Sequence, residues 1–475
     1  MKNLHTDTII APATIPGTGA VSIIRLSGQD SIPAAESLIQ LSSGKLSDFK
    51  GYTAHYGLIY NDDGSLLDEV VATVFRAPHS YSGEDSVEIS CHASSYIVSE
   101  IIRLFINKGV RIAEPGEFTR RAFINGKMDL AQAEAVADVI SSTTSASHRV
   151  AMNQLRGGVS RELATLRAQL LNMASLLELE LDFSEEEVEF ASRSALLDLV
   201  DKASAQISAL TETYRLGNAI RRGIPVAIAG GTNAGKSTLL NLMLGDERAI
   251  VSPVAGTTRD TIEETLTIGG ILFRLIDTAG IRETDETVES LGIGRSFQKI
   301  SQAEIIILVL DITDEESVLL NNLQTVVSSF SPETQELIIL ANKMDLEGNQ
   351  GDNKNVNTIN KFVSSIDKEV KVIYFSAKTG RGLQMLKDQL VSLRKDIIPT
   401  EDSTFITNAR HYEALTEALS HLRKVHASLL SRSTSSDLLA EDLRHIITAL
   451  GRITGDTISP DEILGNIFQN FCIGK

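Results

Sequence analysis

The sequence predicts a multidomain protein that combines α/β and helical parts: an N-terminal α/β domain, a helical domain made of two separated segments, and a doubly wound α/β domain inserted between them. Its 475 residues suggest two to four domains at about 150 residues each. Between residues 224 and 398, short apolar runs alternate with helical stretches, as in a sheet of buried parallel strands. On both sides of that stretch, apolar residues recur at the spacing of helices.

Residues 1–125 are predicted to form the first α/β domain. The segments GAVSIIRL, DEVVATVFRA and SVEISCH have the composition of strands, and turn-rich stretches such as NDDGS and SYSGED separate them. The pattern SSYIVSEIIRLFINKG predicts a helix that ends at Gly109, because glycine is common just after a helix C-terminus.

The helical domain is predicted in two parts, residues 126–220 and residues 399–475. The leucines at helical spacing in the first part are Leu163, Leu166, Leu170, Leu177 and Leu181. The second part contains the stretches EALTEALSHLRKVHASLLS and AEDLRHIITALGRITG and ends in a functional C-terminal tail. The inserted domain, residues 221–398, contains the strand-like runs IPVAIAG, FRLIDTAG, EIIILVLD, LIILANKMD and VKVIYFSA.

Composition and charge exclude several classes of protein. With 42% apolar and 22% charged residues, the composition is that of an ordinary globular protein. The longest apolar run, residues 305–310, is far shorter than the roughly 20 residues that span a bilayer. The first residues have no apolar h-region, so we expect no secretory signal. Two cysteines cannot make a disulfide framework or a Cys-rich zinc site, so we expect a cytoplasmic protein without membrane contact. The net charge of −18 means that any RNA contact must use a local basic patch or a partner.

A phosphate-binding loop is predicted at AGGTNAGKST, which follows the predicted strand 224–229 and has the spacing G-x-x-x-x-G-K-S from Gly230 to Ser237. A glycine-rich turn lets backbone N–H groups surround phosphates, and the dipole of the following helix adds to the attraction. Lys236 can reach the β and γ phosphates, and Ser237 can ligate Mg²⁺. The strand before the turn and the helix after it are the context that a nucleotide site requires.

Three segments further along the chain indicate that the nucleotide carries guanine. DTAG, residues 277–280, ends a strand, where its carboxylate can hold Mg²⁺ through water. In NKMD, residues 342–345, Asp345 can accept from the N1–H and amino groups of guanine, whereas adenine would leave it poorly paired. SAK, residues 376–378, can contact the guanine carbonyl through its backbone. Together with the phosphate loop, these segments predict a GTP site.

The motifs alone leave the groups that drive hydrolysis open. Ras-type GTPases orient water with a Gln directly after D-x-x-G, and here that position is Ile281. Thr258 in AGTTRD can be a switch threonine for Mg²⁺. Asn233 can hold a monovalent cation beside the β/γ bridge or make a local loop hydrogen bond, and Arg282 is the candidate if an arginine acts instead. The acidic candidates for orienting water are Glu283, Asp285, Glu286 and Glu289.

Several segments resemble the MnmE (TrmE) family of tRNA-modification GTPases, over essentially the whole chain. They are PGTGAVSIIRLSG, GEFTRRAFINGKMDLAQAEAVADVI, NAGKSTLLN, AGTTRD, DTAGIR with VESLGI, and the terminal FCIGK. The resemblance implies an N-terminal folate-binding and dimerisation domain, a discontinuous helical domain and an inserted Ras-like P-loop G domain. It also implies a homodimer and an FAD-dependent partner, MnmG (GidA). With that partner, a potassium-activated GTPase would install a carboxymethylaminomethyl or aminomethyl group on C5 of the tRNA wobble uridine.

The resemblance assigns the catalytic group and the ions. The family's catalytic glutamate falls on Glu289, within VESLGI. The implied Mg²⁺ ligands are Ser237 and Thr258. The implied K⁺ ligands, from side chains and backbone oxygens, are Asn233, Thr257, Ser252 and Val254. Members of the family often carry Pro before the loop asparagine, whereas this chain has Thr232 at that position. This difference leaves the ligand atoms unchanged.

Two ligand sets follow from the motifs and the resemblance. The expected GTP contacts are Asn233, Ala234, Gly235, Lys236, Ser237, Thr238, Ser252, Pro253, Val254, Ala255, Gly256, Thr257, Thr258, Asp277, Thr278, Ala279, Gly280, Asn342, Lys343, Asp345, Ser376, Ala377 and Lys378. The implied contacts of a tetrahydrofolate derivative, in the 5-formyl or methylene form, are Arg25, Glu88, Lys127 and Lys475. Glu88 can pair with the donor edge of a pterin, although an exposed strand residue fits the same pattern.

The chain ends in FCIGK, and its second cysteine is Cys472. We do not expect a prenylation box, because the last residue is Lys475 and no polybasic stretch precedes it. Phe471 and Ile473 offer apolar groups to bury, so we expect the tail to be held in place. The resemblance puts the tail beside the folate pocket, where Cys472 would act as a nucleophile or general base, or simply pack as a small apolar group.

Two other functions compete with this interpretation. A ribosome-assembly GTPase of the Era or EngA type adds a KH domain or a second G domain, and the sequence contains neither a basic G-x-x-G module nor a second phosphate loop. A folate-binding interaction protein with a vestigial GTPase disagrees with the complete set of nucleotide motifs. The leading hypothesis is an enzyme that hydrolyses GTP to drive conformational steps in tRNA modification.

Overall fold

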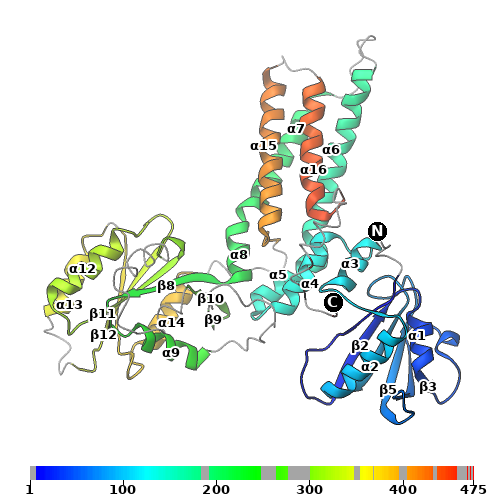
Figure 1. The fold of residues 1–475 in the computed structure, drawn as a ribbon. Coiled ribbons are helices and arrows are strands. Elements are labelled where there is room, and N and C mark those ends of the chain that lie inside the picture. The colour runs from blue at the N-terminus through cyan, green and yellow to red at the C-terminus, as the bar shows by residue number, and fades with distance from the viewer. Residues whose placement is uncertain are drawn as a thin grey trace. The chain divides into compact units, whose positions relative to one another are not determined.

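The computed structural model of the chain (Figure 1) describes residues 7–182, 192–247, 264–276, 300–346, 354–366, 368–394, 404–431 and 436–456, with Phe468, Phe471 and Gly474. The chain divides into two compact units that are each built from separated segments. The first unit contains Met1–Ala137, Gln154–Asp201 and Ser420–Lys475, and the second contains Asp138–Asn153 and Lys202–Leu419. Within the described segments, no helix has both the length and the apolarity needed to cross a bilayer.

The N-terminal part of the first unit is a seven-stranded sheet with the strand order β3-β4-β5-β6-β2-β1-β7. Its strands are β1 (Ile9–Pro12), β2 (Val21–Ser27), β3 (Ile39–Leu41), β4 (Thr53–Tyr60), β5 (Leu66–Phe75), β6 (Ser86–His92) and β7 (Arg111–Ile112). Neighbouring strands pair antiparallel, except β1 and β7, which are parallel. The three strands and the helix predicted from the sequence are confirmed as β2, β5, β6 and α2 (Ser95–Asn107).

Helices α1 (Ser31–Leu38) and α2 cover one face of this sheet. Alternate strand residues such as Ile24 point to that face and pack with Ile32 of α1 and Phe105 of α2 in one core. The other face is open over the middle of the sheet, because Tyr56 and its cross-strand partner Val71 are 50% and 40% exposed. Half-burial of this kind is typical of antiparallel sheets.

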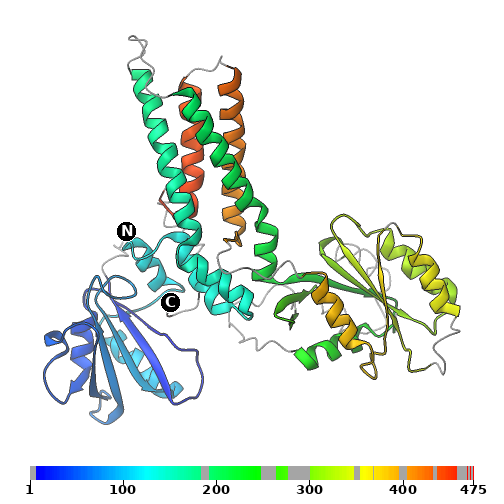
Figure 2. The same ribbon diagram turned by 180° about the vertical axis from the view of Figure 1, so that it is seen from behind.

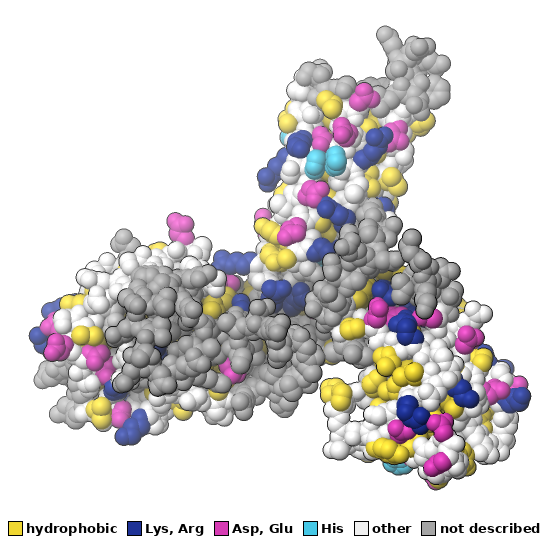
Figure 3. Space-filling model, in the orientation of Figure 1, with side chains coloured by type: hydrophobic (Ala, Val, Ile, Leu, Met, Phe, Trp, Pro, Cys, Tyr) yellow, Lys and Arg dark blue, Asp and Glu magenta, His cyan; other side chains and the backbone are white. Residues whose placement is uncertain are grey.

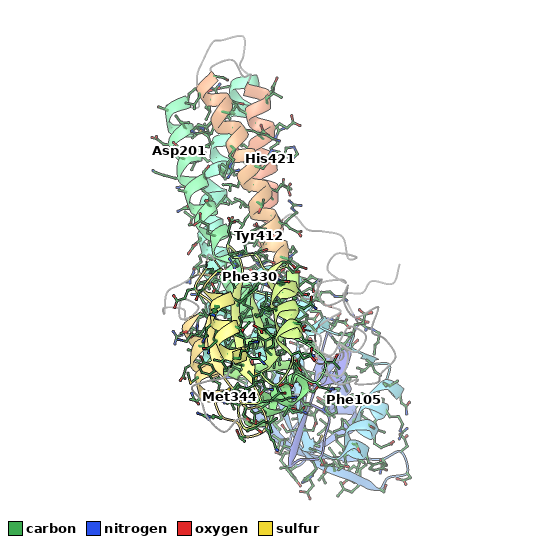
Figure 4. All side chains as sticks on the ribbon, turned by 90° about the vertical axis from the view of Figure 1, so that its left-hand side faces the viewer. Phe105, Asp201, Phe330, Met344, Tyr412 and His421 are labelled. Atoms are coloured by element: carbon green, nitrogen blue, oxygen red, sulfur yellow. The ribbon has the colours of Figure 1, made fainter. Side chains whose placement is uncertain are left out.

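The first unit continues into helices. After α3 (Glu117–Ile124) and α4 (Leu130–Ser141), the long helices α6 (Gly158–Asp182) and α16 (Ser436–Thr454) lie side by side in Figures 1 and 2 and pack against each other. Arg444 of α16 pairs with Glu178 of α6 at 2.8 Å. Figure 4 labels Asp201 near the middle of α7 (Arg193–Glu212) and His421 near the middle of α15 (Ala409–Ser431), and Asp201 Oδ1 lies 3.3 Å from Nε2 of His426 in α15. Segments before and after the second sheet thus share one helical layer.

The second unit contains a six-stranded sheet with the order β13-β12-β11-β8-β10-β9. Its strands are β8 (Ile224–Gly230), β9 (Glu264–Ile268), β10 (Ile271–Leu275), β11 (Ile305–Asp311), β12 (Glu336–Asn342) and β13 (Lys371–Tyr374). All neighbours are parallel except β9 and β10. The strand-like runs predicted between residues 224 and 375 are confirmed as β8, β10, β11, β12 and β13.

Helices cover both faces of this sheet. On one face, Ile307 of β11 packs with α9 (Lys236–Glu247) and α14 (Leu383–Ser392). On the other face, Leu308 packs with α12 (Glu316–Val327) and α13 (Lys354–Val363). The doubly wound α/β arrangement expected from the continuous apolar strands is therefore present.

Two helices and a non-helical segment of the second unit extend its core. Val150 of α5 (Ser145–Leu155), Ile220 of α8 (Tyr214–Arg222) and Phe405 belong to the same apolar cluster as the strands. The chain segments that lead into and out of the sheet are also joined, because the Ile406 N–H donates to Thr213 Oγ1 at 3.0 Å. Tyr412 of α15, labelled in Figure 4, stacks on Tyr214 with a centroid distance of 4.4 Å. The hydrophobic core of the second unit thus includes residues from outside the sheet and its four flanking helices.

Candidate functional site

The predicted phosphate loop connects β8 to α9. Strand β8 ends at Gly230, and α9 begins at Lys236. Gly230 and Gly235 have φ angles of +146° and +102°, and a Cβ at these positions would collide with the Val309 carbonyl and the Asn342 side chain respectively. Both glycines are therefore required by the backbone conformation and by the close approach of neighbours.

Lys236 lies across the phosphate loop. Its Nζ donates to the carbonyl oxygens of Gly230 and Gly231 at 2.9 and 2.6 Å. Burial lowers the pKa of Lys236. A cation at a helix N-terminus, beside a glycine-rich turn, is the arrangement that attracts phosphate.

Asn342, the first residue of NKMD, joins two loops at the carboxyl edge of the sheet. It is 2% exposed. Its Nδ2 donates to the Ala234 carbonyl of the phosphate loop at 2.7 Å, and its Oδ1 accepts from the Ala377 N–H of SAK at 2.9 Å. The structure therefore brings together three motifs that are far apart in the sequence.

Asp345 is exposed at this edge and held from one side. The Ser376 hydroxyl donates to Asp345 Oδ1 at 2.7 Å. That hydrogen bond is the main reason why the pKa of Asp345 is lowered. The carboxylate is charged at neutral pH and can accept from two donors on one edge of a base. Met344, which Figure 4 labels, comes between Lys343 and Asp345 in the sequence, and its side chain is buried.

Arg25 and Glu88 face each other across β2 and β6. Arg25 Nε donates to Glu88 Oε1 at 2.8 Å, and their side chains are 18% and 24% exposed. The Arg25 guanidinium lies 5.0 Å from the centroid of the Tyr81 ring and 5.7 Å from that of Phe118. Phe118 of α3 covers Ile9 and Ala11 of β1. The ion pair thus lies at the border between the covered and the open part of the sheet face.

Lys127 contacts the loop that carries Tyr81. Its Nζ donates to the Pro78 carbonyl at 2.9 Å, and its side chain lies beside Gly83. Asn125 Nδ2 donates to the Ser82 carbonyl at 2.8 Å, and the Tyr81 hydroxyl is 2.8 Å from Thr119 Oγ1. The segment after α3 therefore holds residues 78–83 in place next to Arg25.

The described residues of the C-terminal tail pack on the N-terminal domain. Phe468 is 1% exposed and clusters with Leu130 and Ala133, and its ring meets that of Phe471 edge to face at 5.1 Å. A Cβ on Gly474 would collide with the Pro12 carbonyl, so the tail backbone closely approaches the end of β1.

Pro12 and its neighbour Ala11 pair with Ile24 and Arg25 in the sheet. The end of the tail therefore lies one strand away from Arg25.

Comparison with known proteins identifies the family. The family model described as "GTP-binding protein TrmE N-terminus" matches residues 8–127, and the model described as "MnmE helical domain" matches residues 130–472. A Bacteroides thetaiotaomicron protein named tRNA modification GTPase MnmE is 48% identical, covering 99% of this chain and 100% of its own. A Porphyromonas gingivalis protein of the same name is 48% identical, covering 100% of this chain and 99% of its own. The chain belongs to the MnmE family.

Solved structures add little to this assignment. The G domain of the T. maritima FeoB iron transporter is 25% identical to this chain, with a TM-score of 0.25. The match covers 36% of this chain and 97% of that domain. A score this low carries no weight, so membership of the MnmE family rests on the family models and the full-length relatives.

Part of the predicted MnmE-type site lies outside the described residues. The GTP and ion contacts from Ser252 to Thr258, the DTAG segment from Asp277 to Gly280, and the water-orienting candidates around Glu289 belong to this group. Cys472 and Lys475 of the tail also lie outside. Among the described loop residues, Asn233 is exposed with a left-handed backbone, φ +60°, and Thr238 and Lys378 are exposed.

Sequence reasoning missed two features that adjoin these sites. Asp311, the last residue of β11, forms an ion pair with Lys343 of NKMD. Within GEFTRRAF, Glu117 is fully buried and accepts from Arg111 and Arg121 at 2.6 and 3.0 Å, and Arg121 also pairs with Glu84 at 3.1 Å. Glutamate and arginine four residues apart on a helix hinted at the second feature. No motif pointed to the first.

Proposed function

We propose that this chain is a cytoplasmic, potassium-activated GTPase that acts with the FAD-dependent protein MnmG (GidA). The pair installs a carboxymethylaminomethyl or aminomethyl group on C5 of the tRNA wobble uridine. Family membership already gives the coarser statement, that the chain is a tRNA modification GTPase. The proposed domains are residues 1–125, 126–220, 221–398 and 399–475, and the family model that ends at residue 127 supports the first boundary.

The Asn342 bridge is the observation that carries the nucleotide half of this proposal. One amide fixes the phosphate loop against SAK, so a ligand that contacts both loops meets a preformed site. Asp345, charged and exposed beside that bridge, supports guanine as the base. The N1–H and amino groups of guanine would both donate to it, whereas the N1 of adenine is an acceptor and would repel it.

The ions and the catalytic group are proposed from the family resemblance. Ser237 is the second residue of α9, directly after Lys236. A hydroxyl at this position can reach a Mg²⁺ ion that is bound to the phosphates. Asn233 supports the proposed K⁺ site, because its left-handed backbone sits at the exposed tip of the loop. Thr258 would complete the Mg²⁺ set, and Glu289 would orient the attacking water.

A folate site is proposed at the Arg25–Glu88 pair. The pair lies on a face that neighbouring helices leave partly open, and Tyr81 supplies an aromatic side. A charged carboxylate there fits the donor edge of a pterin, and a guanidinium fits a carboxylate or carbonyl group. Lys127 and the tail with Lys475 would complete the set, which the close approach of Gly474 to Pro12 supports.

A homodimer is proposed through the open face of the N-terminal sheet. Val21, Tyr56 and Val71 are 60%, 50% and 40% exposed, and the register aligns Tyr56 with Val71 on adjacent strands. An apolar face on a sheet is the kind of surface that a second copy covers.

Contact with tRNA is proposed through a local patch or through the partner. In the side chains that Figure 3 displays, Lys and Arg are interspersed with Asp and Glu and form no continuous basic field. The net charge of −18 agrees with that distribution. A local basic patch or MnmG would therefore hold the nucleic acid.

Analysis of modified nucleosides tests the whole proposal. In tRNA from a strain that lacks this protein, we expect wobble uridines without the C5 group, and expression of the intact chain should restore it. Normal wobble uridines together with unprocessed ribosomal subunits would overturn the proposal and favour a ribosome-assembly GTPase.

A further inference from the structure

Asp311 ends β11 at the same edge of the sheet as the nucleotide motifs, although it belongs to none of them. The parallel register places Asp311 of β11 beside Asn342, the last residue of β12. Lys343 directly follows Asn342. The side chain of Asp311 is 6% exposed and that of Lys343 is 31% exposed. Asp311 Oδ2 forms an ion pair with the Lys343 ammonium.

The Asp311 carboxylate is fixed by groups on its own loop. Its Oδ1 accepts from the Thr313 N–H at 3.0 Å and from the Thr313 hydroxyl at 2.7 Å. Burial by itself would raise the pKa of Asp311, but hydrogen bonds from Lys343 and Thr313 hold it below the usual value. One oxygen is thus committed to Thr313, and the other is left for Lys343.

The backbone of Lys343 is unusual as well. Its φ of +69° is in the left-handed region, which lysine adopts at a cost. The flanking residues Asn342 and Met344 are 2% and 6% exposed, so they fix this conformation from both sides. Strained backbone held by buried neighbours is a feature of ligand sites, because it aims a side chain in one direction.

We propose that Asp311 is a positioning residue for the guanine nucleotide. It anchors the ammonium of Lys343, so that the apolar stem of the lysine forms one wall of the base site while Asp345 pairs with the base edge. This inference rests on the proposed GTP site. Without the anchor, Lys343 samples many rotamers, and each binding event must order it again. Asp311 therefore affects nucleotide affinity and residence time, and leaves the hydrolysis step of bound GTP unchanged.

A double-mutant cycle on the intact protein tests this inference. The dissociation rate of fluorescently labelled GDP is measured for the wild type, Asp311→Asn, Lys343→Ala and the double variant. We expect each single variant to weaken binding by about tenfold, and the double variant to be no weaker than Lys343→Ala alone. The turnover number at saturating GTP should stay near the wild-type value in Asp311→Asn. Thr313→Val, which removes one hydroxyl from the carboxylate, should weaken binding in the same direction by a smaller factor.

Asp314→Asn is the matched control. Asp314 is three positions from Asp311 and is also partly buried. Its backbone N–H donates to the Asp311 carbonyl. The Asp314→Asn substitution therefore removes a nearby negative charge without removing the carboxylate that pairs with Lys343. We expect it to leave GDP dissociation unchanged. An equal effect of Asp314→Asn, or a full additional loss when Asp311→Asn is added to Lys343→Ala, would overturn the positioning role. If Lys343→Ala itself leaves nucleotide affinity unchanged, the proposed base site is wrong, which is a different failure.

Discussion

The two sheets of this chain bury their strands in different ways. In β11 of the second unit all seven residues are buried, whereas in β5 of the first unit buried positions alternate with exposed or half-buried ones over most of the strand. Helices cover both faces of the sheet that contains β11, and α1 and α2 cover one face of the sheet that contains β5. The same chain therefore contains one two-sided and one one-sided sheet.

This difference explains where each candidate site lies. A sheet that is covered on both faces leaves ligands only the edge at the carboxyl ends of its strands. Gly230, Asp311 and Asn342 end three such strands. A one-sided sheet offers a face, and Arg25 and Glu88 lie on that face. The burial pattern of a strand thus predicts whether function is found at its end or on its side.

The largest expected effect concerns packing. Leu308→Ala in β11 should lower the free energy of unfolding by about 2–5 kcal/mol, because the residue is fully buried between helices. Val71→Ala on the open face of β5 should cost less than about 1 kcal/mol in the monomer. Urea unfolding of both variants makes the comparison. Equal losses would mean that the open face is packed as tightly as the two-sided core.

The next effect separates the two sites by ligand. Asp345→Asn should weaken GTP binding by roughly 100-fold and admit xanthosine triphosphate, because an amide donates where the carboxylate only accepts. Titration with both nucleotides measures the change. Folate binding by the same variant should stay normal, and GTP affinity equal to that of the wild type would contradict the role of Asp345.

A smaller effect is expected at the open face. Glu88→Gln should weaken binding of 5-formyltetrahydrofolate by about tenfold, because it removes the charge that faces Arg25 and the pterin donors. Basal GTP hydrolysis should not change. Calorimetric titration of the folate measures the loss, and Glu84→Gln, which alters a carboxylate in the Arg121 network, is the matched control. An effect on GTP turnover would break the separation of the two sites.

The smallest effect is a pH dependence in the first sheet. His92 is on β6, and its Nδ1 donates a hydrogen bond to the Asp68 carboxylate, which raises the pKa of His92 above the unfolded value of about 6.5. A group with a raised pKa stabilises the fold fully below the unfolded pKa, and this stabilisation is lost as pH rises through the folded pKa. The stability advantage of the wild type over His92→Gln should therefore be larger at pH 5.5 than at pH 8.5, in urea unfolding at about 25 °C. A larger advantage at the higher pH would contradict it.

Local patterns were enough to predict most strands and the phosphate loop. The run 305–310 is apolar without interruption, and with Asp311 it forms the central, fully buried strand β11. The GEFTRRAF segment is different, because its helix α3 places charged residues in the interior, where only their pairing with each other makes burial tolerable. The helical spacing of Glu117 and Arg121 hinted at one pair, but periodicity could not predict the partners Arg111 and Glu84, which lie outside α3.

Contacts that depend on register and packing could not be predicted from the sequence. Asp311 meets Lys343 only because β11 and β12 are parallel with that register. The helical pattern predicted over residues 126–220 did not indicate that Ile220 packs with the strands of the second sheet. The Tyr81 ring reaches Arg25 through a loop, and loops carry no period from which to place a side chain.

We propose that the two sites serve different steps, with GTP bound at the strand ends and a folate bound at the open face. Deletion of residues 471–475 tests it most directly, because the described part of this tail contacts the N-terminal domain at Gly116 and Pro12. One truncated protein is assayed for tRNA modification and for basal GTP hydrolysis. We expect modification to be abolished while hydrolysis keeps its wild-type rate. Loss of hydrolysis with tRNA still modified would contradict it.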